Sequence, residues 1–330
     1  MFLLLAVISC ENTVFDPIEK EGRIFVEAFL DESGKNLIKV SVAQPIGGSI
    51  STSPQQIKIK ILADGNEVKL NPDKTHSTST VCAYRTDTGF EVGQKLKLTA
   101  EATRLPSVEA ETYIPEKLPK VWTDDNLNTL IYNFNIQLFI EEPYAQGKWF
   151  GVQILKRKRY EFTGLVPENI RKQYEKQTGI EEFDEICEKE TITDNNGLVS
   201  VRSNMIVGLN GGDMMITEGM KRDEKTTCLQ IPVKITGKTL VASSSHENYK
   251  IYEYHEYKTR LYRLTKESYS YLKSRYIAEN SSTLIDLGFS PVNYSYTNIT
   301  GGLGIFAGTA TYDSEWTAYN DYWHDYVPKE

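Results

Sequence analysis

The sequence predicts a mainly β protein, with an N-terminal immunoglobulin-like β-sandwich followed by a second β-rich domain with short helices. Residues 22–116 contain seven short strand-like runs with turn signals between them, which is typical of such a sandwich. The chain also has 20 tyrosines, and aromatic residues favour half-buried sheet surfaces. Pro115 and Pro119 then mark a boundary before residues 120–330, because proline removes a backbone donor and stiffens the chain.

The strands predicted for the sandwich follow one another closely. Their ranges are Ile24–Leu30, Leu37–Ala43, Gln56–Leu62, Glu67–Leu70, Thr80–Arg85, Gln94–Ala100 and Val108–Tyr113. The clearest alternation places Ile57, Ile59 and Ile61 inward and the lysines between them outward. The segment 63–66, Ala-Asp-Gly-Asn, predicts a hairpin turn directly after them. One face of this sheet is therefore expected to be buried and the other exposed to solvent.

The second domain is expected to begin near Val121 and to continue with strands. The next strand-like runs are Asn133–Ile140 and Trp149–Lys156. Residues 167–190 are polar and charged, with weak helical spacing, which predicts one or two short helices. Thr265 can cap a further helix near residues 265–279. These elements describe a β-rich domain interrupted by short helices.

The first ten residues have the pattern of a processed export signal. Phe2–Ile8 is apolar but much shorter than the roughly 20 residues that span a bilayer, which predicts a signal peptide over residues 1–9. The tetrapeptide 7–10, Val-Ile-Ser-Cys, resembles the bacterial lipobox, so Cys10 is expected to carry a diacylglyceryl group and residues 10–21 to form a lipidated tether. No Lys or Arg precedes the run, which a start codon placed too far downstream would explain. An ordinary N-terminal strand with a free thiol is the alternative.

Composition excludes some classes of function. A net charge of -8 argues against nucleic-acid binding, which needs clustered Lys and Arg. Cys82, Cys187 and Cys228 have no Cys-x-x-Cys spacing, which argues against a zinc or redox site. Export into an oxidising space would permit a disulfide between Cys187 and Cys228. No apolar run after Cys10 is long enough to cross a membrane, so the membrane is expected as a partner through the lipid alone.

The sequence contains few patterns that resemble catalytic or cofactor-binding motifs. The segment 301–304, Gly-Gly-Leu-Gly, is followed by apolar residues rather than by Gly-Lys-Ser/Thr, so it predicts a bulge or a close approach of two backbones. The histidines share no metal-ligand spacing; they are His76, His246, His255 and His324. No serine lies in Gly-x-Ser-x-Gly. No catalytic residue, metal or cofactor is therefore predicted.

Three charged or aromatic patterns leave alternatives open. Residues 156–159, Lys-Arg-Lys-Arg, are expected to alternate between the faces of a charge-protected sheet edge. The pairs 141–142 and 181–182, each Glu-Glu, suit either a solvated surface or the two carboxylates of glycoside hydrolysis. An aromatic stripe at helical spacing is formed by Trp316, Tyr319, Trp323 and Tyr326. It can dock onto its own domain or bind sugars or peptides by stacking.

Several short segments together carry a family resemblance. They are the lipobox, Arg23–Ala28, Thr112–Pro115, Tyr269–Leu272 and Asn298–Phe306. The last is similar to a closing Asn-Ile-x-x-Gly-Leu-Gly-x-Phe segment, and together they resemble the Bacteroidetes lipoproteins known as domain of unknown function 4249. The resemblance implies an outer-membrane lipoprotein associated with a TonB-dependent receptor, and it supplies no catalytic residues.

Three functions follow as hypotheses. The leading one is a non-enzymatic accessory lipoprotein of the outer membrane that binds a nutrient or a TonB-dependent receptor in uptake. Both the periplasmic face and the cell surface are left open as its location. The second is a surface hydrolase that acts on glycans through a carboxylate pair. The third is a structural or adhesive surface module.

Overall fold

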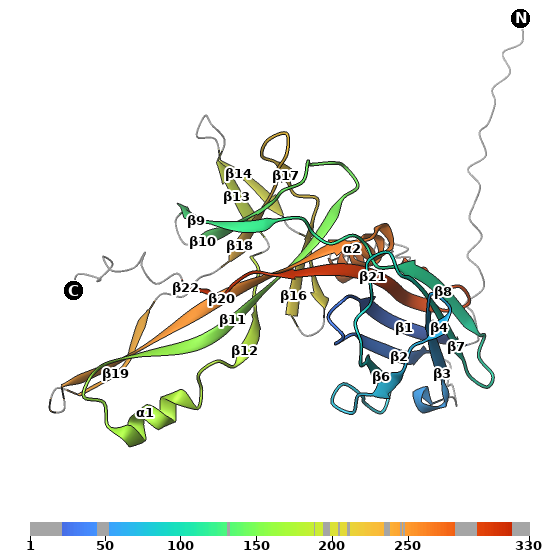
Figure 1. The fold of residues 1–330 in the computed structure, drawn as a ribbon, viewed down its shortest axis with the longest axis horizontal. Coiled ribbons are helices and arrows are strands. Elements are labelled where there is room, and N and C mark those ends of the chain that lie inside the picture. The colour runs from blue at the N-terminus through green and yellow to red at the C-terminus, as the bar shows by residue number, and fades with distance from the viewer. Residues whose placement is uncertain are drawn as a thin grey trace, which may run out of the picture.

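The computed structural model describes most of the chain between residues 22 and 318. The described ranges are 22–44, 53–130, 133–187, 189–193, 199–203, 205–209, 212–233, 238–244, 246, 248–280 and 296–318. Within them the protein is mainly β, as predicted, and carries two α-helices (Figure 1). The predicted signal peptide, Cys10 and the tether lie outside the described residues. In the part of the chain that is described, neither helix has the length and hydropathy of a membrane span.

Two sheets face each other in the N-terminal half. One contains β1 (Arg23–Leu30), β2 (Leu37–Ala43), β6 (Val81–Thr86) and β5 (Leu70–Pro72), in that order. The other contains β4 (Asn66–Glu67), β3 (Lys58–Ala63), β7 (Lys95–Glu101) and β8 (Val108–Tyr113). Every second residue of β1, from Ile24 to Leu30, is fully buried, because successive side chains of a strand point to opposite faces. The predicted β-sandwich is confirmed, and a single 3-10 turn, Pro54–Gln56, precedes β3 in the described residues.

The hairpin between β3 and β4 forms where the sequence predicts it. Asp64 and Gly65 have φ angles of 46° and 84°, and a two-residue turn of this kind matches the twist of the strands it joins. Ile57 and Ile61 are buried, Ile59 is half-buried, and the lysines between them are exposed. The alternation of isoleucine and lysine therefore gives the strand one buried face and one solvent-exposed face.

The sandwich also takes a strand from the far end of the chain. β21 (Leu303–Asp313) pairs in parallel with β1, and its Phe306 lies in the sandwich core. The pairing needs glycine, because a Cβ on Gly304, which has a φ of 100°, would lie 1.9 Å from the Val26 carbonyl oxygen. The predicted close approach of two backbones is thus confirmed at this glycine. The block predicted over residues 22–116 is completed by residues nearly 200 positions later.

β21 joins the two halves into one continuous sheet. The described strands follow the order β15-β16-β11-β20-β21-β1-β2-β6-β5, with three more strands attached at the side of this path. The additional members of the path are β15 (Met205–Leu209), β16 (Gly212–Thr217), β11 (Trp149–Gly164) and β20 (Tyr249–Leu264). The strands at the side are β12 (Glu181–Asp184), β19 (Thr239–Ser244) and β22 (Thr317–Ala318). Figure 1 shows β11 and β20 as a long paired ribbon with β19 near its far end.

A second core lies between this long sheet and a separate four-stranded sheet. The strands of the latter are β17 (Met220–Lys221), β18 (Thr227–Val233), β10 (Asn133–Ile140) and β9 (Val121–Leu130). Alternate residues of β10, among them Ile136 and Leu138, pack against Val152 and Leu261 of the ribbon. A small hairpin joins β13 (Lys189–Thr193) to β14 (Val199–Ser203). A strand that begins at Val121 thus contributes to this second core, and the predicted domain limits stay a prediction.

The two helices cover different parts of the sheet. α1 (Glu168–Glu175) lies on the ribbon, where the rings of Tyr174 and Tyr160 form an edge-to-face pair with centroids 4.9 Å apart. α2 (Lys266–Asn280) begins after Thr265, whose Oγ1 accepts a hydrogen bond from the Ser268 N–H, as the predicted cap requires. Leu272 of α2 packs on β21 in a third core. One stretch of the long sheet is therefore covered by α2.

The expectation that residues 156–159 form a sheet edge is wrong for Lys156 and Arg157, which have a strand on each side. β11 lies inside the sheet, paired with β20 along its whole length and with β12 over residues 154–157. The basic side chains are neutralised instead by acids of these neighbours. Arg157 and Arg159 share Glu256, at 2.5 and 2.8 Å, which confirms that alternate residues face the same side.

Candidate ligand groove

A groove with a volume of about 980 Å³ crosses the face of the long sheet beside α2. Its floor is made of alternate residues of neighbouring strands, such as Arg260, Tyr262 and Leu264 of β20. Thr309, Thr311 and Asp313 of β21 continue it toward β1 and β2. A second depression, of about 780 Å³, is lined by the N-terminal sandwich alone. The groove on the long sheet is lined by residues from both halves.

The position of the groove follows from strand periodicity and from the length of α2. On β21, Ile305 and Ala307 are buried in the core beneath α2, while Thr309, Thr311 and Asp313 continue the same face without that cover. Side chains two residues apart share a face, so hydroxyl and carboxylate groups replace aliphatic ones where the helix ends. The sequence thus changes from apolar to polar along one side of a single strand.

The second-domain wall of the groove is held by an ion pair and a buried tyrosine. The guanidinium of Arg260 donates two hydrogen bonds to Asp313, both 2.7 Å long, and these bonds raise the pKa of Arg260. Burial raises the pKa of Tyr262, so its hydroxyl stays protonated and donates to Gln153 Oε1 at 2.8 Å. Gln153 is itself fully buried and donates to the Leu209 carbonyl. This wall is rigid before any ligand arrives.

The turn between β1 and β2 forms the facing wall. Asp31 accepts hydrogen bonds from the Ser33 N–H at 2.8 Å and from Thr311 Oγ1 at 2.8 Å, which ties the turn to β21. The buried Asn36 holds the turn from inside through the backbone of Asp31 and the hydroxyl of Thr86. Side-chain amides and carboxylates commonly satisfy turn backbone in this way. The Asp31 carboxylate is therefore fixed at the groove.

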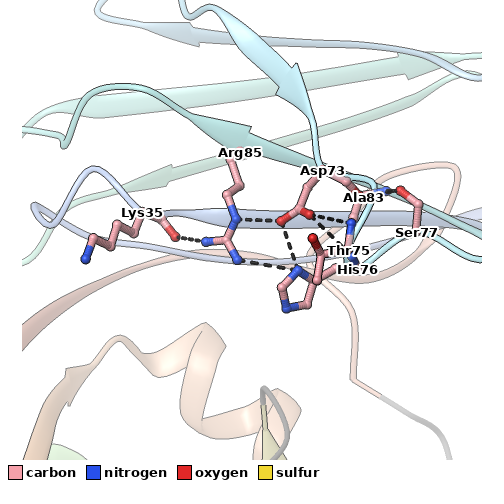
Figure 2. A network of polar contacts seen from close by, with 7 residues as sticks. All are labelled: Lys35, Asp73, Thr75, His76, Ser77, Ala83 and Arg85. Atoms are coloured by element: carbon pink, nitrogen blue, oxygen red, sulfur yellow. Dashed lines mark hydrogen bonds and ion pairs between the residues drawn. The ribbon is translucent and has the colours of Figure 1, made fainter. Parts of the chain in front are cut away.

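A network around Asp73 lies at the β6 end of the groove (Figure 2). Asp73 Oδ2 is 2.5 Å from Arg85 Nε and 2.9 Å from His76 Nδ1, and Oδ1 accepts from the N–H groups of Thr75 and His76. Arg85 Nη1 also donates to the carbonyl of Lys35 at 3.0 Å. Partial burial raises the pKa of Asp73, but the bonds from Arg85 and His76 outweigh it and lower that pKa to about 2. The carboxylate stays charged and orients both partners.

Trp316, which is the described member of the predicted aromatic stripe, does not line the groove. Trp316 is docked on its own domain, with the Arg157 guanidinium 4.3 Å and the Lys258 ammonium 4.8 Å from its ring centre. It is followed by the strand β22, so the predicted helical stripe does not start there. Extended pairing with β20 takes precedence over the helical spacing in this segment. Tyr319, Trp323 and Tyr326 lie outside the described residues.

The predicted disulfide stays a prediction. The Cys187 N–H donates to the carbonyl of Pro232 at 2.8 Å, while Cys228 lies four residues earlier on β18. At about 3.3 Å per residue this places them roughly 13 Å apart along the strand, whereas a disulfide needs Cα atoms about 4.4–6.8 Å apart. A bond between them would require the backbone to move.

The predicted carboxylate pairs do not line the groove. Glu142 is bound to Arg263 at 2.8 Å and Lys148 at 3.4 Å, whereas Glu141 is exposed. Glu181 and Glu182 are both exposed neighbours on β12, so they point to opposite faces. Among the described residues, no group of three or more His, Cys, Asp or Glu side chains is arranged to hold a metal ion.

Sequence reasoning missed the groove residues. The spacing Asp73-x-x-His76 was visible, since an aspartate often accepts backbone hydrogen bonds two or three residues ahead in a turn. Arg85 joins this pair only because β6 returns beside the turn. The contact between Asp31 and Thr311 spans 280 positions, and no local pattern points to it.

These observations define a class: a β protein with two sandwich cores and a ligand-sized groove on the sheet that joins them. The chain belongs to the family described as Domain of unknown function (DUF4249), whose model matches residues 11–315. The predicted family is thereby confirmed. No curated protein matches the chain.

Two solved structures resemble the chain weakly. One is the adhesin InvE of Yersinia pseudotuberculosis, with 9% identity, a TM-score of 0.21, and coverage of 72% of this chain and 54% of the adhesin. This chain therefore spans about half the length of that protein. The other is described as the complete structure of manganese lipoxygenase of Gaeumannomyces graminis and partial structure of zonadhesin of Komagataella pastoris. Its identity is 8%, its TM-score 0.20, and the match covers 74% of this chain and 90% of the other.

Proposed function

We propose that this protein is a non-catalytic binding lipoprotein that holds a nutrient in the groove and acts beside a TonB-dependent receptor of the outer membrane. The groove is the observation that carries the proposal. Its volume of about 980 Å³ is at the upper end of the range for small-molecule sites, and its polar side chains are already fixed by hydrogen bonds. Fixed polar groups bind a ligand with little loss of conformational freedom.

The setting comes from the sequence and from the family. The lipobox at residues 7–10 supports a lipid on Cys10, and the family resemblance supports the association with a TonB-dependent receptor. The alternative of a glycan hydrolase requires two carboxylates that face one bond. The groove carboxylates Asp31 and Asp313 are each engaged by neighbouring side chains, which favours binding over hydrolysis.

The test separates anchoring from binding. Cys10→Ala should move the protein from the membrane to the soluble fraction. Two acyl chains anchor a protein stably, and the variant has no thiol to carry them. Ser33→Trp places a large side chain on the exposed turn that lines the groove, and Thr163→Trp is a matched control on the exposed ribbon. Native mass spectrometry of protein purified from its own cells should detect a bound small molecule in the wild type and in the control.

The same molecule should be absent from Ser33→Trp, and uptake of the nutrient identified in this way should fall in cells that carry this variant. Receptor association is tested by co-purification from solubilised membranes. Retention of the molecule by Ser33→Trp would contradict binding in the groove. Persistence of Cys10→Ala in the membrane would contradict the anchor.

A further inference from the structure

The β2–β6 end of the groove presents hydrogen-bond donors, while the acids that balance their charge lie beneath them. Lys35, Lys39 and Arg85 line the groove here. The paired acids are Glu27 and Asp73, whose side chains are only 16% and 8% exposed and do not line it. A ligand at this end meets N–H groups first.

Arg85 keeps unused donors in a fixed orientation. A guanidinium carries five N–H donors. Arg85 uses Nε on Asp73 and one Nη1 donor on the carbonyl of Lys35, and its Nη2 is 3.5 Å from His76 Nδ1. The remaining Nη donors are therefore available at the groove, on a side chain that is already immobilised. A planar fork of this kind suits a carboxylate or phosphate.

His76 is oriented by the same carboxylate. Its Nδ1 contacts Asp73, and in Figure 2 the other ring nitrogen, Nε2, points away from that contact. No side chain or backbone group in the described ranges hydrogen-bonds to Nε2. When the ring is protonated, Nδ1–H donates to Asp73 and Nε2–H is left for a ligand.

The acids elsewhere in the groove already have partners. Asp31 accepts from Thr311, Glu32 pairs with Lys117 at 2.8 Å, and Asp313 pairs with Arg260. Lys35, by contrast, forms no ion pair with any described residue, and it is exposed. Among the described residues that line the groove, an anion at the β6 end therefore meets no acid that lacks a partner.

We propose that this end of the groove binds an acidic group of the ligand, a carboxylate, phosphate or sulfate, between Arg85 and His76, with Asp73 as a positioning residue. The proposal rests on the proposed function and narrows its ligand to an organic anion. Lys35 adds charge at the rim of the same subsite. The apolar and aromatic residues of the groove, such as Phe29 and Tyr262, are left for the body of the ligand.

The subsite can be tested without knowing the whole ligand. The full chain, with histidine rings isotope-labelled, is titrated with inorganic phosphate, sulfate and acetate at constant ionic strength and constant pH. The His76 signal should shift and saturate, and the His255 signal should not. Comparing the three anions shows which acidic group is preferred.

Variants separate the subsite from general charge. Arg85→Lys keeps the charge but loses the fork, and it should weaken phosphate binding about tenfold. Lys35→Met, at an exposed position, should weaken it several-fold even where Arg85→Lys fails to fold. Lys58→Met, an exposed lysine on the other sheet of the sandwich, should change nothing.

The outcomes distinguish the two proposals. Shifts of His76 that do not saturate for any anion, or equal affinity in wild type, Arg85→Lys and Lys35→Met, would overturn the anion subsite. Saturable binding at His76 combined with retention of the co-purified molecule by Ser33→Trp would preserve the subsite and reject the proposed function. Loss of that molecule in Ser33→Trp without anion binding at His76 would preserve the proposed function and reject the anion subsite.

Discussion

Replacing Gly304 by alanine should separate β21 from β1 and destabilise the N-terminal sandwich. The new Cβ would lie 1.9 Å from the Val26 carbonyl oxygen. Carbon and oxygen ordinarily stay about 3.3 Å apart, so the two strands must open by about 1.4 Å. A ladder hydrogen bond of about 2.9 Å stretched by that amount no longer forms.

The magnitude follows from two contributions. Two lost ladder bonds cost about 1 kcal/mol each. Holding an alanine at the φ of 100° that Gly304 adopts adds about 1–2 kcal/mol. The free energy of unfolding should therefore fall by about 3–4 kcal/mol, which for a chain of this size lowers the melting temperature by roughly 5 °C.

Two control substitutions at other glycines separate the cost of backbone strain from the cost of the steric clash. Gly65→Ala also has a positive φ, 84°, but meets no atom within 4 Å, so it should show the backbone strain alone. Gly208→Ala, on the exposed edge strand β15, has open space and no positive φ, so it should be neutral or slightly stabilising. Urea unfolding followed by circular dichroism measures all three. If Gly304→Ala unfolds at the same midpoint as Gly65→Ala, the close approach of β21 to β1 is not a rigid feature of the fold.

Two further predictions concern the pH response and the domain boundary. Because the pKa of Asp73 is lowered from 3.8 to about 2, the stability that the charged carboxylate contributes is complete above about pH 4 and is lost as the pH falls toward 2. Asp73→Asn should remove this part of the dependence of the unfolding midpoint on pH. A variant with the same pH dependence as the wild type would refute the prediction. A fragment of residues 22–116 should expose its core, because Ile299 and Phe306 belong to that core and β21 pairs with β1; strong binding of a hydrophobic dye is expected, and adding residues 296–318 through a flexible linker should reduce it.

Local structure was predictable where local chemistry decides it. The strands Leu37–Ala43, Val108–Tyr113 and Asn133–Ile140 have the predicted limits, because alternation and turn residues specify them. The helix after Thr265 was predictable for the same reason, since its cap lies within its own sequence. These elements depend on neighbours only a few residues away.

The partners of the strands were not predictable in the same way. The run 156–159 suggested an edge, yet β12 and β20 supply Asp184, Glu253 and Glu256 to neutralise it. Trp316 suggested the start of a helical stripe, yet β20 offers an extended partner to the residues after it. In both places the sequence pattern was visible, but its meaning depended on residues of other strands that lie at least 28 positions away. Residue spacing alone does not contain that information.

The strand β21 explains why the groove belongs to neither half alone. Phe306 on one face packs in the N-terminal sandwich, Ile305 on the other face packs under α2, and Tyr312 packs against the second core. Further along, Thr311 and Asp313 bind Asp31 of the first half and Arg260 of the second. A ligand that spans from Arg85 to Arg260 therefore contacts both halves across one shared strand. Its binding energy adds to the stability of the junction, because anything that binds only the assembled fold shifts the equilibrium toward it.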